Sequence, residues 1–324
     1  MIESGQRITN YFLGMKSSPA SRLKSFSSAF LREFTRLLDK VLKDVPMSQV
    51  SAVKFQNTRN FLLKSNTRVC WKNSNGYKIP MVMDKISGKS FRICVIARAA
   101  GYQNGFKTKG EEIASSYGLD MVPLRSGDLV VDIGANVGDL LLYLDEIHSA
   151  VNVSYLGIEP GIAEFECLKS NLKIADGNVS QIAIGSDCGE QNFFYSPQGA
   201  DSSLFKPLEV SEEYTVRVQT LDCLLSQERY AHKRIRFLKL ECEGGELEAL
   251  QGAKNSLSRI DYIGADLGFE KGELQESPAP EVIHFLLANG FRVEYFTYPA
   301  IIRILFRNNA VIENLNSRNG SLSH

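Results

Sequence analysis

Short apolar runs alternate with amphipathic segments between residues 121 and 308, and this alternation constrains the fold more than any other feature of the sequence. Runs of strand length lie at 129–133, 154–158, 179–184, 235–240 and 260–265. Helical spacing follows four of them, at 140–144, 162–172, 246–257 and 281–287, and runs at 291–296 and 301–306 suggest a hairpin. Strand–helix alternation is typical of a parallel sheet with helices on both faces, so we predict an α/β domain over 121–308.

A glycine-containing turn follows the first run and reads DIGANVG from Asp132 to Gly138. Gly134 and Gly138 permit a tight turn and a close approach of the backbone to a ligand. Asn136 tolerates left-handed backbone angles, so it can stand where a glycine would otherwise be needed. In parallel sheets ligands bind beyond the carboxyl ends of strands. The turn is therefore either structural or part of a ligand site.

Glu159 ends the second run and lies about 25 residues after Gly134, close to the spacing at which an acid reaches ribose hydroxyls. A carboxylate accepts two hydrogen bonds from a vicinal diol, so the pattern fits an adenosine-type cofactor, either NAD or S-adenosylmethionine. The dinucleotide fingerprint G-x-G-x-x-G is absent. Asp132, two residues before the first glycine, favours S-adenosylmethionine, which has an amino group and no pyrophosphate.

A charged cluster ends the fourth run, where Lys239, Glu241 and Glu243 alternate along the chain. Alternation places these side chains on one side of an extended segment. Two carboxylates at a strand end can orient a hydroxyl, act as a general base or hold a metal ion. The alternative is an internal ion-pair network in which Lys239 neutralises a carboxylate.

The chain resembles the FkbM family of S-adenosylmethionine-dependent methyltransferases over about residues 120–300. Four segments carry the resemblance: 131–138, Ile158-Glu159-Pro160, Thr220-Leu221-Asp222, and 239–244 with the helix pattern after it. The resemblance implies a class I methyltransferase (Rossmann-like) fold with a seven-stranded sheet and helices on both faces. It also implies methylation of hydroxyl groups, often on sugars or polyketide-like metabolites.

The resemblance also assigns roles to residues of this chain. Cofactor-binding residues are Asp132, Gly134, Ala135, Asn136, Gly138, Glu159, Pro160, Ala183 and Ile184. Candidate catalytic residues are Lys239, Glu241, Glu243 and Asp266, and Ser202 and Ser203 are candidate substrate contacts. The family usually has Asp where this chain has Glu241, and the extra methylene argues against a role in metal binding. We therefore predict no metal site.

Charge is unevenly distributed between the two parts of the chain. The whole chain has 37 basic and 37 acidic residues, whereas residues 1–120 hold 20 basic and 8 acidic ones, which leaves +12 there and −12 in the rest. We expect a basic amphipathic helical extension at 1–60, a small β-containing lead-in with an Asn75-Gly76 hairpin at 61–120, and a flexible tail at 309–324. The basic part either meets an anionic partner or is attracted to the acidic part.

Six cysteines are scattered without a C-x-x-C pair and only four histidines occur, so a zinc site is not expected and the thiols are interpreted as reduced. The first residues lack the apolar core of a signal peptide, and no run approaches the roughly 20 apolar residues that span a bilayer. These features predict a cytoplasmic protein without a transmembrane segment.

The sequence therefore predicts an S-adenosylmethionine-dependent O-methyltransferase that acts on a small-molecule or glycan hydroxyl. In this hypothesis Glu241 or Asp266 takes or orients the hydroxyl proton. Two alternatives are an RNA methyltransferase that uses the basic N-terminal region and a non-catalytic relative that binds the cofactor without turnover. The oligomeric state is not predicted.

Overall fold

The computed structural model describes residues 49–310, with gaps at 75–76, 147–150, 197–201, 208–209, 211 and 298–301. The chain divides into two units, residues 1–65 and residues 66–324. The described part of the first unit is helix α3 (Gln49–Leu62). Residues 1–48 of the expected basic amphipathic extension and the tail beyond residue 310 lie outside the described residues. No helix in the described part of the chain is long and apolar enough to cross a membrane.

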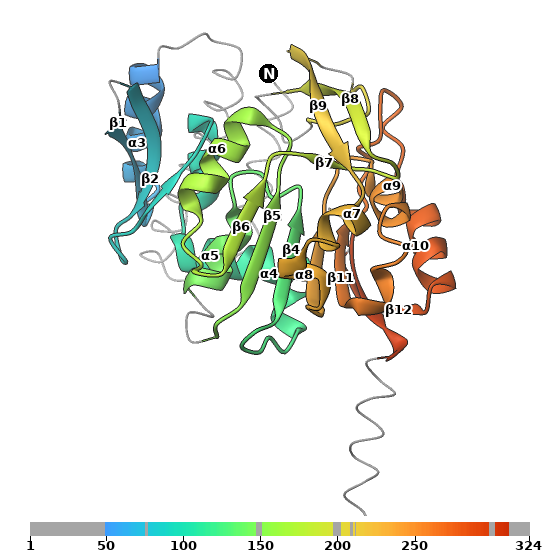
Figure 1. The fold of residues 1–324 in the computed structure, drawn as a ribbon. Coiled ribbons are helices and arrows are strands. Elements are labelled where there is room, and N and C mark those ends of the chain that lie inside the picture. The colour runs from blue at the N-terminus through green and yellow to red at the C-terminus, as the bar shows by residue number, and fades with distance from the viewer. Residues whose placement is uncertain are drawn as a thin grey trace, which may run out of the picture. The chain divides into compact units, whose positions relative to one another are not determined.

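A seven-stranded sheet forms the centre of the second unit (Figure 1). Its strands are β4 (Leu129–Ile133), β5 (Ser154–Ile158), β6 (Gly177–Ser180), β10 (Ile235–Leu240), β11 (Ile260–Asp266), β12 (Phe291–Thr297) and β13 (Arg303–Asn308). The order is β12-β13-β11-β10-β4-β5-β6, in which only β13 pairs antiparallel with its neighbours. The predicted seven-stranded α/β sheet and the C-terminal hairpin are confirmed.

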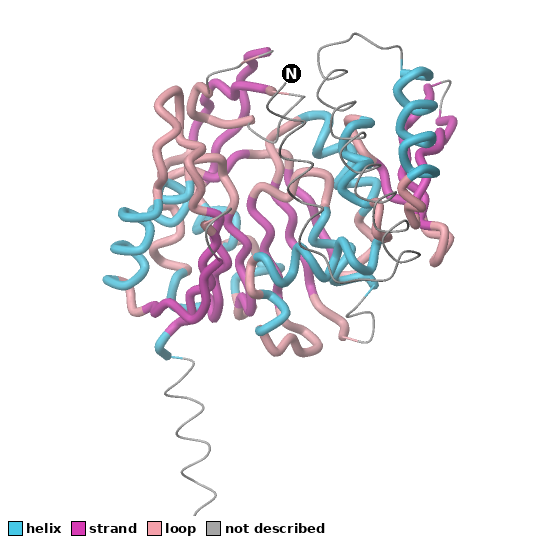
Figure 2. The backbone as a smooth tube through the Cα atoms, turned by 180° about the vertical axis from the view of Figure 1, so that it is seen from behind, coloured by secondary structure: helices cyan, strands magenta, loops and turns pink. Residues whose placement is uncertain are grey.

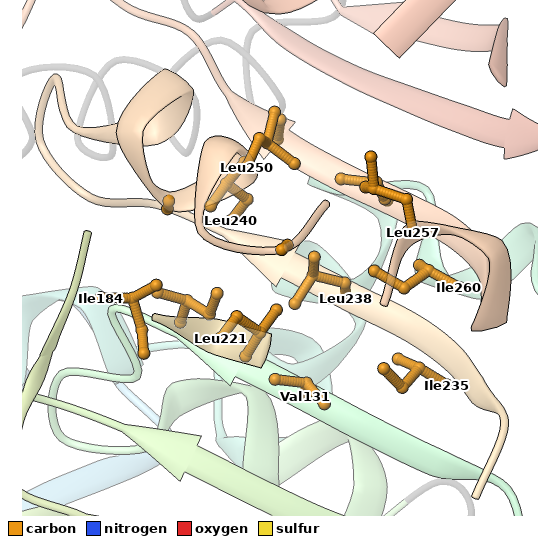
Figure 3. Close-up of a cluster of buried hydrophobic side chains, with 14 of the residues drawn as sticks. Val131, Ile184, Leu221, Ile235, Leu238, Leu240, Leu250, Leu257 and Ile260 are labelled. Atoms are coloured by element: carbon orange, nitrogen blue, oxygen red, sulfur yellow. The ribbon is translucent and has the colours of Figure 1, made fainter. Parts of the chain in front are cut away.

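Helices cover both faces of this sheet, as the views from front and back show (Figures 1 and 2). They are α4 (Phe106–Ser116), α5 (Asp139–Glu146), α6 (Ile162–Asn171), α7 (Leu221–Leu225), α8 (Glu228–Ala231), α9 (Glu246–Gln251) and α10 (Ala279–Ala288). Alternate side chains of a strand enter two different apolar clusters, because neighbouring residues of a strand point to opposite faces. Val131 and Leu238 pack with Leu221 of α7 and Leu250 of α9 (Figure 3), and their cluster also contains residues of α10. Val130 and Phe237 pack with residues of α4, α5 and α6.

The third apolar run, predicted as one strand over 179–184, is instead divided between two sheets. Strand β6 ends at Ser180, and β7 (Ala183–Ile184) joins a second sheet of order β7-β9-β8. Its other strands, β8 (Gly189–Tyr195) and β9 (Glu212–Gln219), were not predicted. The division arises because β7 pairs in parallel with the end of β9, a partner that local periodicity does not reveal.

The helix predicted over 246–257 ends six residues early, at Gln251. A Cβ at Gly252 would lie 2.1 Å from the carbonyl oxygen of Gly185, so the chain passes directly over another backbone segment there. The remaining residues turn and form the 3₁₀ helix η3 (Leu257–Arg259).

The lead-in forms a separate three-stranded antiparallel sheet from β1 (Thr67–Ser74), β2 (Tyr77–Asp84) and β3 (Ser90–Arg92). Ser74 pairs with Tyr77, which confirms the predicted two-residue hairpin loop. The strand predicted over 91–96 is shorter than expected, because the chain turns into the 3₁₀ helix η1 (Ile96–Tyr102). A further 3₁₀ turn, η2 (Leu119–Met121), leads toward β4.

Candidate active site

A pocket opens at the carboxyl ends of β4, β5 and β10, where the order of the parallel strands reverses. Such a switch point is the usual ligand site of an open α/β sheet. Eleven of the predicted cofactor-binding and catalytic residues line it: Asp132, Gly134, Ala135, Asn136, Glu159, Pro160, Ala183, Ile184, Lys239, Glu241 and Glu243. Gly138 and Asp266 do not belong to the lining. Residues far apart in the sequence are thus brought to one cavity.

The glycine turn after β4 adopts the left-handed backbone that its sequence predicts. Gly134, Asn136 and Gly138 have φ angles of 70°, 50° and 92°. A Cβ at Gly134 would lie 1.8 Å from the carbonyl oxygen of Glu241, so only glycine permits this contact with the end of β10. The amide of Gly134 donates to the carbonyl of Ile158 over 3.0 Å. The turn is therefore held between two neighbouring strands.

Glu159 projects into the pocket with only 6% of its surface exposed. Its Oε2 accepts from the amide of Asn136 at 2.8 Å, and its Oε1 accepts from the amide of Gly161 at 2.7 Å. Burial raises the pKa of this carboxyl to about 7, against the opposing effect of the two amides. A carboxylate oxygen can accept a second hydrogen bond, so Glu159 retains acceptor capacity toward a ligand.

Lys239 lies at the centre of a buried charge network. Its Nζ lies 3.1 Å from Asp132 Oδ1 and 2.7 Å from Glu241 Oε2, and it donates to the carbonyl of Gly134 at 2.9 Å. Tyr155 donates to the other oxygen of Asp132 at 2.8 Å. Burial opposes the charge of Lys239, but the two carboxylates outweigh it and raise the pKa of the ammonium group. Lys239 therefore stays charged and ties the glycine turn to β10.

Arg303 on β13 extends the network and was not identified from the sequence. Its guanidinium lies 2.7 Å from Asp266 Oδ2 and 3.3 Å from Glu241 Oε1, and it stacks 4.2 Å from the ring centre of Tyr117. Burial by itself would raise the pKa of Glu241. The charges of Lys239 and Arg303 outweigh burial and lower this pKa to about 2. The ion-pair network predicted as the alternative to a catalytic cluster is therefore present around Glu241. The only sequence signal for Arg303 was a basic residue within an apolar run.

A pair of carboxyl groups, those of Glu243 and Glu270, lies beside this network. Glu243 lines the pocket with a left-handed φ of 50°, and its carbonyl accepts from Ser203 Oγ at 2.7 Å. A Cβ at Gly244 would lie 2.5 Å from Lys271 Cα, so the turn after β10 touches the loop after β11. In that contact the carboxyl groups of Glu243 and Glu270 are hydrogen-bonded. Burial, followed by the charges of Asp266 and Glu241, raises the pKa of Glu270 to about 7. Glu270 lies in a loop without periodicity, so sequence reasoning missed it.

The lead-in and the second sheet also contribute to the pocket wall. Arg98 of η1 lines the cavity and lies 3.5 Å from Asp139 Oδ2 at the start of α5, and Tyr102 donates to the other oxygen of Asp139. Ser202 and Ser203 line it from the segment between β8 and β9. The pocket thus includes residues from a region that the family resemblance does not cover. Among the described residues no group of three or more His, Cys, Asp or Glu side chains is arranged to hold a metal ion.

The fold and the site together define a class I methyltransferase, and the comparison with known families agrees. The family model for the methyltransferase FkbM domain matches residues 132–293, which is half of the 324 residues. The chain therefore belongs to the FkbM family of S-adenosylmethionine-dependent methyltransferases. This confirms the resemblance, the methyltransferase class and the cofactor that the sequence predicted.

Curated relatives are distant. The chain is similar to the 31-O-demethyl-FK506 methyltransferase FkbM of Streptomyces tacrolimicus, with 26% identity over 53% of this chain and 75% of the relative. It is also similar to the hexuronic acid methyltransferase AglP of Haloferax volcanii, with 26% identity over 57% of this chain and 80% of the relative. The chain is also similar to the crystal structure of a methyltransferase FkbM from Methylobacillus flagellatus, with 13% identity, coverage of 65% of this chain and 59% of that one, and a TM-score of 0.38.

Proposed function

We propose that this methyltransferase transfers the methyl group to a hydroxyl oxygen of a sugar or of a hydroxylated small metabolite. The observation that carries the proposal is the Glu243–Glu270 carboxyl pair at the pocket, where the pKa of Glu270 is raised to about 7. A base that titrates near neutral pH suits the removal of a hydroxyl proton. The name of one relative, the 31-O-demethyl-FK506 methyltransferase, points to methylation of an oxygen, and the name of the other, a hexuronic acid methyltransferase, points to a sugar acid as acceptor.

The residues of the pocket fit S-adenosylmethionine, which supplies an activated methyl group when it is bound. Glu159 offers spare acceptor positions for the ribose hydroxyls, beside Pro160. Ala183 and Ile184 give an apolar edge for adenine. The turn from Asp132 through Ala135 to Gly138 would hold the methionine part. Both oxygens of Asp132 already face Tyr155 and Lys239, so we assign Asp132 to shaping this turn.

The carboxylates of the charge network around Lys239 differ as proton acceptors from the pair formed by Glu243 and Glu270. Glu241 is held anionic by Lys239 and Arg303, and with a pKa of about 2 it is too weak a base to take a proton at neutral pH. Asp266 is held by the same arginine. Glu270, whose pKa is raised to about 7 and which contacts Glu243 at the cavity wall, is the better proton acceptor. We therefore place Glu241, Asp266 and Lys239 as residues that position the wall of the site.

The test combines binding and transfer. Calorimetric titration with S-adenosylmethionine, with NAD as the control, establishes the cofactor first. S-adenosylmethionine with a ¹³C-labelled methyl group is then incubated with the protein and a panel of macrolide alcohols, neutral sugars, hexuronic acids, amines and RNA. Mass spectrometry finds the methylated product, and the ¹³C shift distinguishes a methyl group on oxygen from one on nitrogen.

We expect binding of S-adenosylmethionine alone and labelled methyl on oxygen. Methyl transfer only to nitrogen, or only to RNA, would overturn the assignment of a sugar or small-metabolite hydroxyl as the acceptor. Cofactor binding without a product across the whole panel would favour the non-catalytic alternative.

A further inference from the structure

Glu164 is a buried carboxylate at the pocket wall that the mechanism above does not use. It lies in the first turn of α6, is 8% exposed and lines the same cavity as Glu159. Its Oε1 accepts from the hydroxyl of Tyr195 and from the thiol of Cys94, both at 3.3 Å. Its Oε2 is buried and has no hydrogen-bond partner within the described part of the chain. Oε1 of Glu164 therefore accepts from two donors, whereas its Oε2 accepts from none in the described part of the chain.

Glu164 and Glu159 approach the same point beside Gly161. A Cβ at Gly161 would lie 2.6 Å from Glu164 Oε2 and 2.9 Å from Glu159 Oε1. The glycine thus leaves room for two carboxylate oxygens side by side. Arg98, which also lines the pocket, is close enough to both Glu164 and Asp139 for their charges to raise its pKa. The positive charge of Arg98 makes a second acid at this wall tolerable.

A buried carboxylate oxygen without a donor costs free energy, and a ligand donor that reaches it recovers that loss. The ribose of an adenosine cofactor carries two neighbouring hydroxyl donors. Both oxygens of Glu159 already accept one backbone amide each, whereas Glu164 Oε2 accepts none. We propose that Glu164 is a second ribose-binding acid, whose Oε2 accepts one of the two hydroxyls beside Glu159. This inference rests on the proposed function, because it requires the cofactor in this pocket.

The test measures affinity for S-adenosylhomocysteine and for its 2′-deoxy and 3′-deoxy analogues by calorimetry. The variant is Glu164→Gln. The amide oxygen should stay with Tyr195 and Cys94, so the amino group faces the ligand in place of an acceptor. Glu166→Gln is the matched control, because Glu166 lies on the same helix with its side chain 51% exposed. Thermal melting of each variant checks that the fold is kept.

We expect Glu164→Gln to weaken binding of S-adenosylhomocysteine about tenfold, the range for a hydrogen bond to a charged group, and Glu166→Gln to leave it unchanged. For one of the deoxy analogues, wild type and Glu164→Gln should bind equally, because the hydroxyl that Glu164 holds is gone. Equal affinities of wild type and Glu164→Gln for the parent ligand would overturn the proposal.

Two further results separate the causes of failure. A loss in Glu164→Gln that persists with both deoxy analogues would assign Glu164 to another donor, such as the adenine amine, and overturn the ribose contact. Failure of the wild-type protein to bind S-adenosylhomocysteine would instead contradict the proposed function, and the inference with it.

Discussion

Replacement of Lys239 by Met tests the buried charge network most directly. Lys239 is 5% exposed and lies 3.1 Å from Asp132 and 2.7 Å from Glu241. Methionine is of similar length and removes only the charge and its hydrogen bonds. Two carboxylates would then remain buried, with Arg303 compensating only Glu241. Removing one partner of a buried ion pair costs about 3–5 kcal/mol in free energy of unfolding.

For a domain of this size that loss corresponds to a fall of about 10 °C in the melting temperature. Calorimetric melting at pH 8 and at pH 5 provides the measurement. Without Lys239 the pKa values of Asp132 and Glu241 rise, so acidification protonates them and removes the cost of their buried charges. The deficit of the variant relative to wild type should therefore be larger at pH 8 than at pH 5.

The matched control is Lys254→Met, because Lys254 is exposed and its substitution should change stability by less than about 0.5 kcal/mol. The double variant Lys239→Met, Glu241→Gln should recover part of the lost free energy of unfolding, because one of the two buried negative charges is gone. A deficit of less than about 1 kcal/mol, or one that is equal at both pH values, would refute the reasoning about buried charge.

Three further predictions follow from single residues. Gly134→Ala should prevent folding, as judged by soluble yield and circular dichroism, because the added Cβ would lie 1.8 Å from a carbonyl oxygen. The control is Gly127→Ala, because Gly127 has a similar φ of 88° but no atom within 4 Å of an added Cβ. This variant should lose only about 1–2 kcal/mol in free energy of unfolding. Affinity for S-adenosylhomocysteine should be about tenfold weaker at pH 6 than at pH 8, because Glu159, with its pKa of about 7, must be ionised for both of its oxygens to accept hydrogen bonds from the backbone amides and from a ribose hydroxyl. A pH dependence that survives in Glu159→Gln would contradict this. Once an acceptor is known, Glu270→Gln should lower turnover and remove the inflection near pH 7 without changing cofactor affinity, and an unaltered pH–rate profile would exclude the carboxyl pair as the base.

The free energy of unfolding should also fall as pH rises from about 4.5 to 7, because two buried acids, Glu159 and Glu246, lose their protons. Burial raises the pKa of both Glu159 and Glu246 to about 7, above the ordinary value of 4.5, so the folded state binds more protons than the unfolded state within that window. The variant Glu246→Gln should show a smaller change of unfolding free energy with pH in this window. An unchanged slope would show that Glu246 ionises normally in the folded protein.

Local patterns determined most of the sheet and the cofactor turn. The apolar runs at β4, β5, β10 and β11 are buried along their whole length apart from one residue of β10, so their strand identity could be predicted without knowing their neighbours. The left-handed turn at Asn136 and the hairpin before Tyr77 depend only on adjacent residues, and both were predicted. The family resemblance also rests on short segments, which is why it could be stated from the sequence.

Tertiary structure alone decided which charges and walls surround the pocket. Glu241 and Arg303 are 62 residues apart in the chain, yet their contact acts together with Lys239 to lower the pKa of the glutamate, which removes Glu241 as the preferred base. Glu270 meets Glu243 only because Gly244 lets two loops touch, and Arg98 reaches the pocket from a lead-in with no recognisable motif. Periodicity encodes the environment of one residue and its near neighbours. The strength of an acid depends instead on burial and on charges brought close by the fold, so the sequence located the acids whereas the structure determined their chemistry.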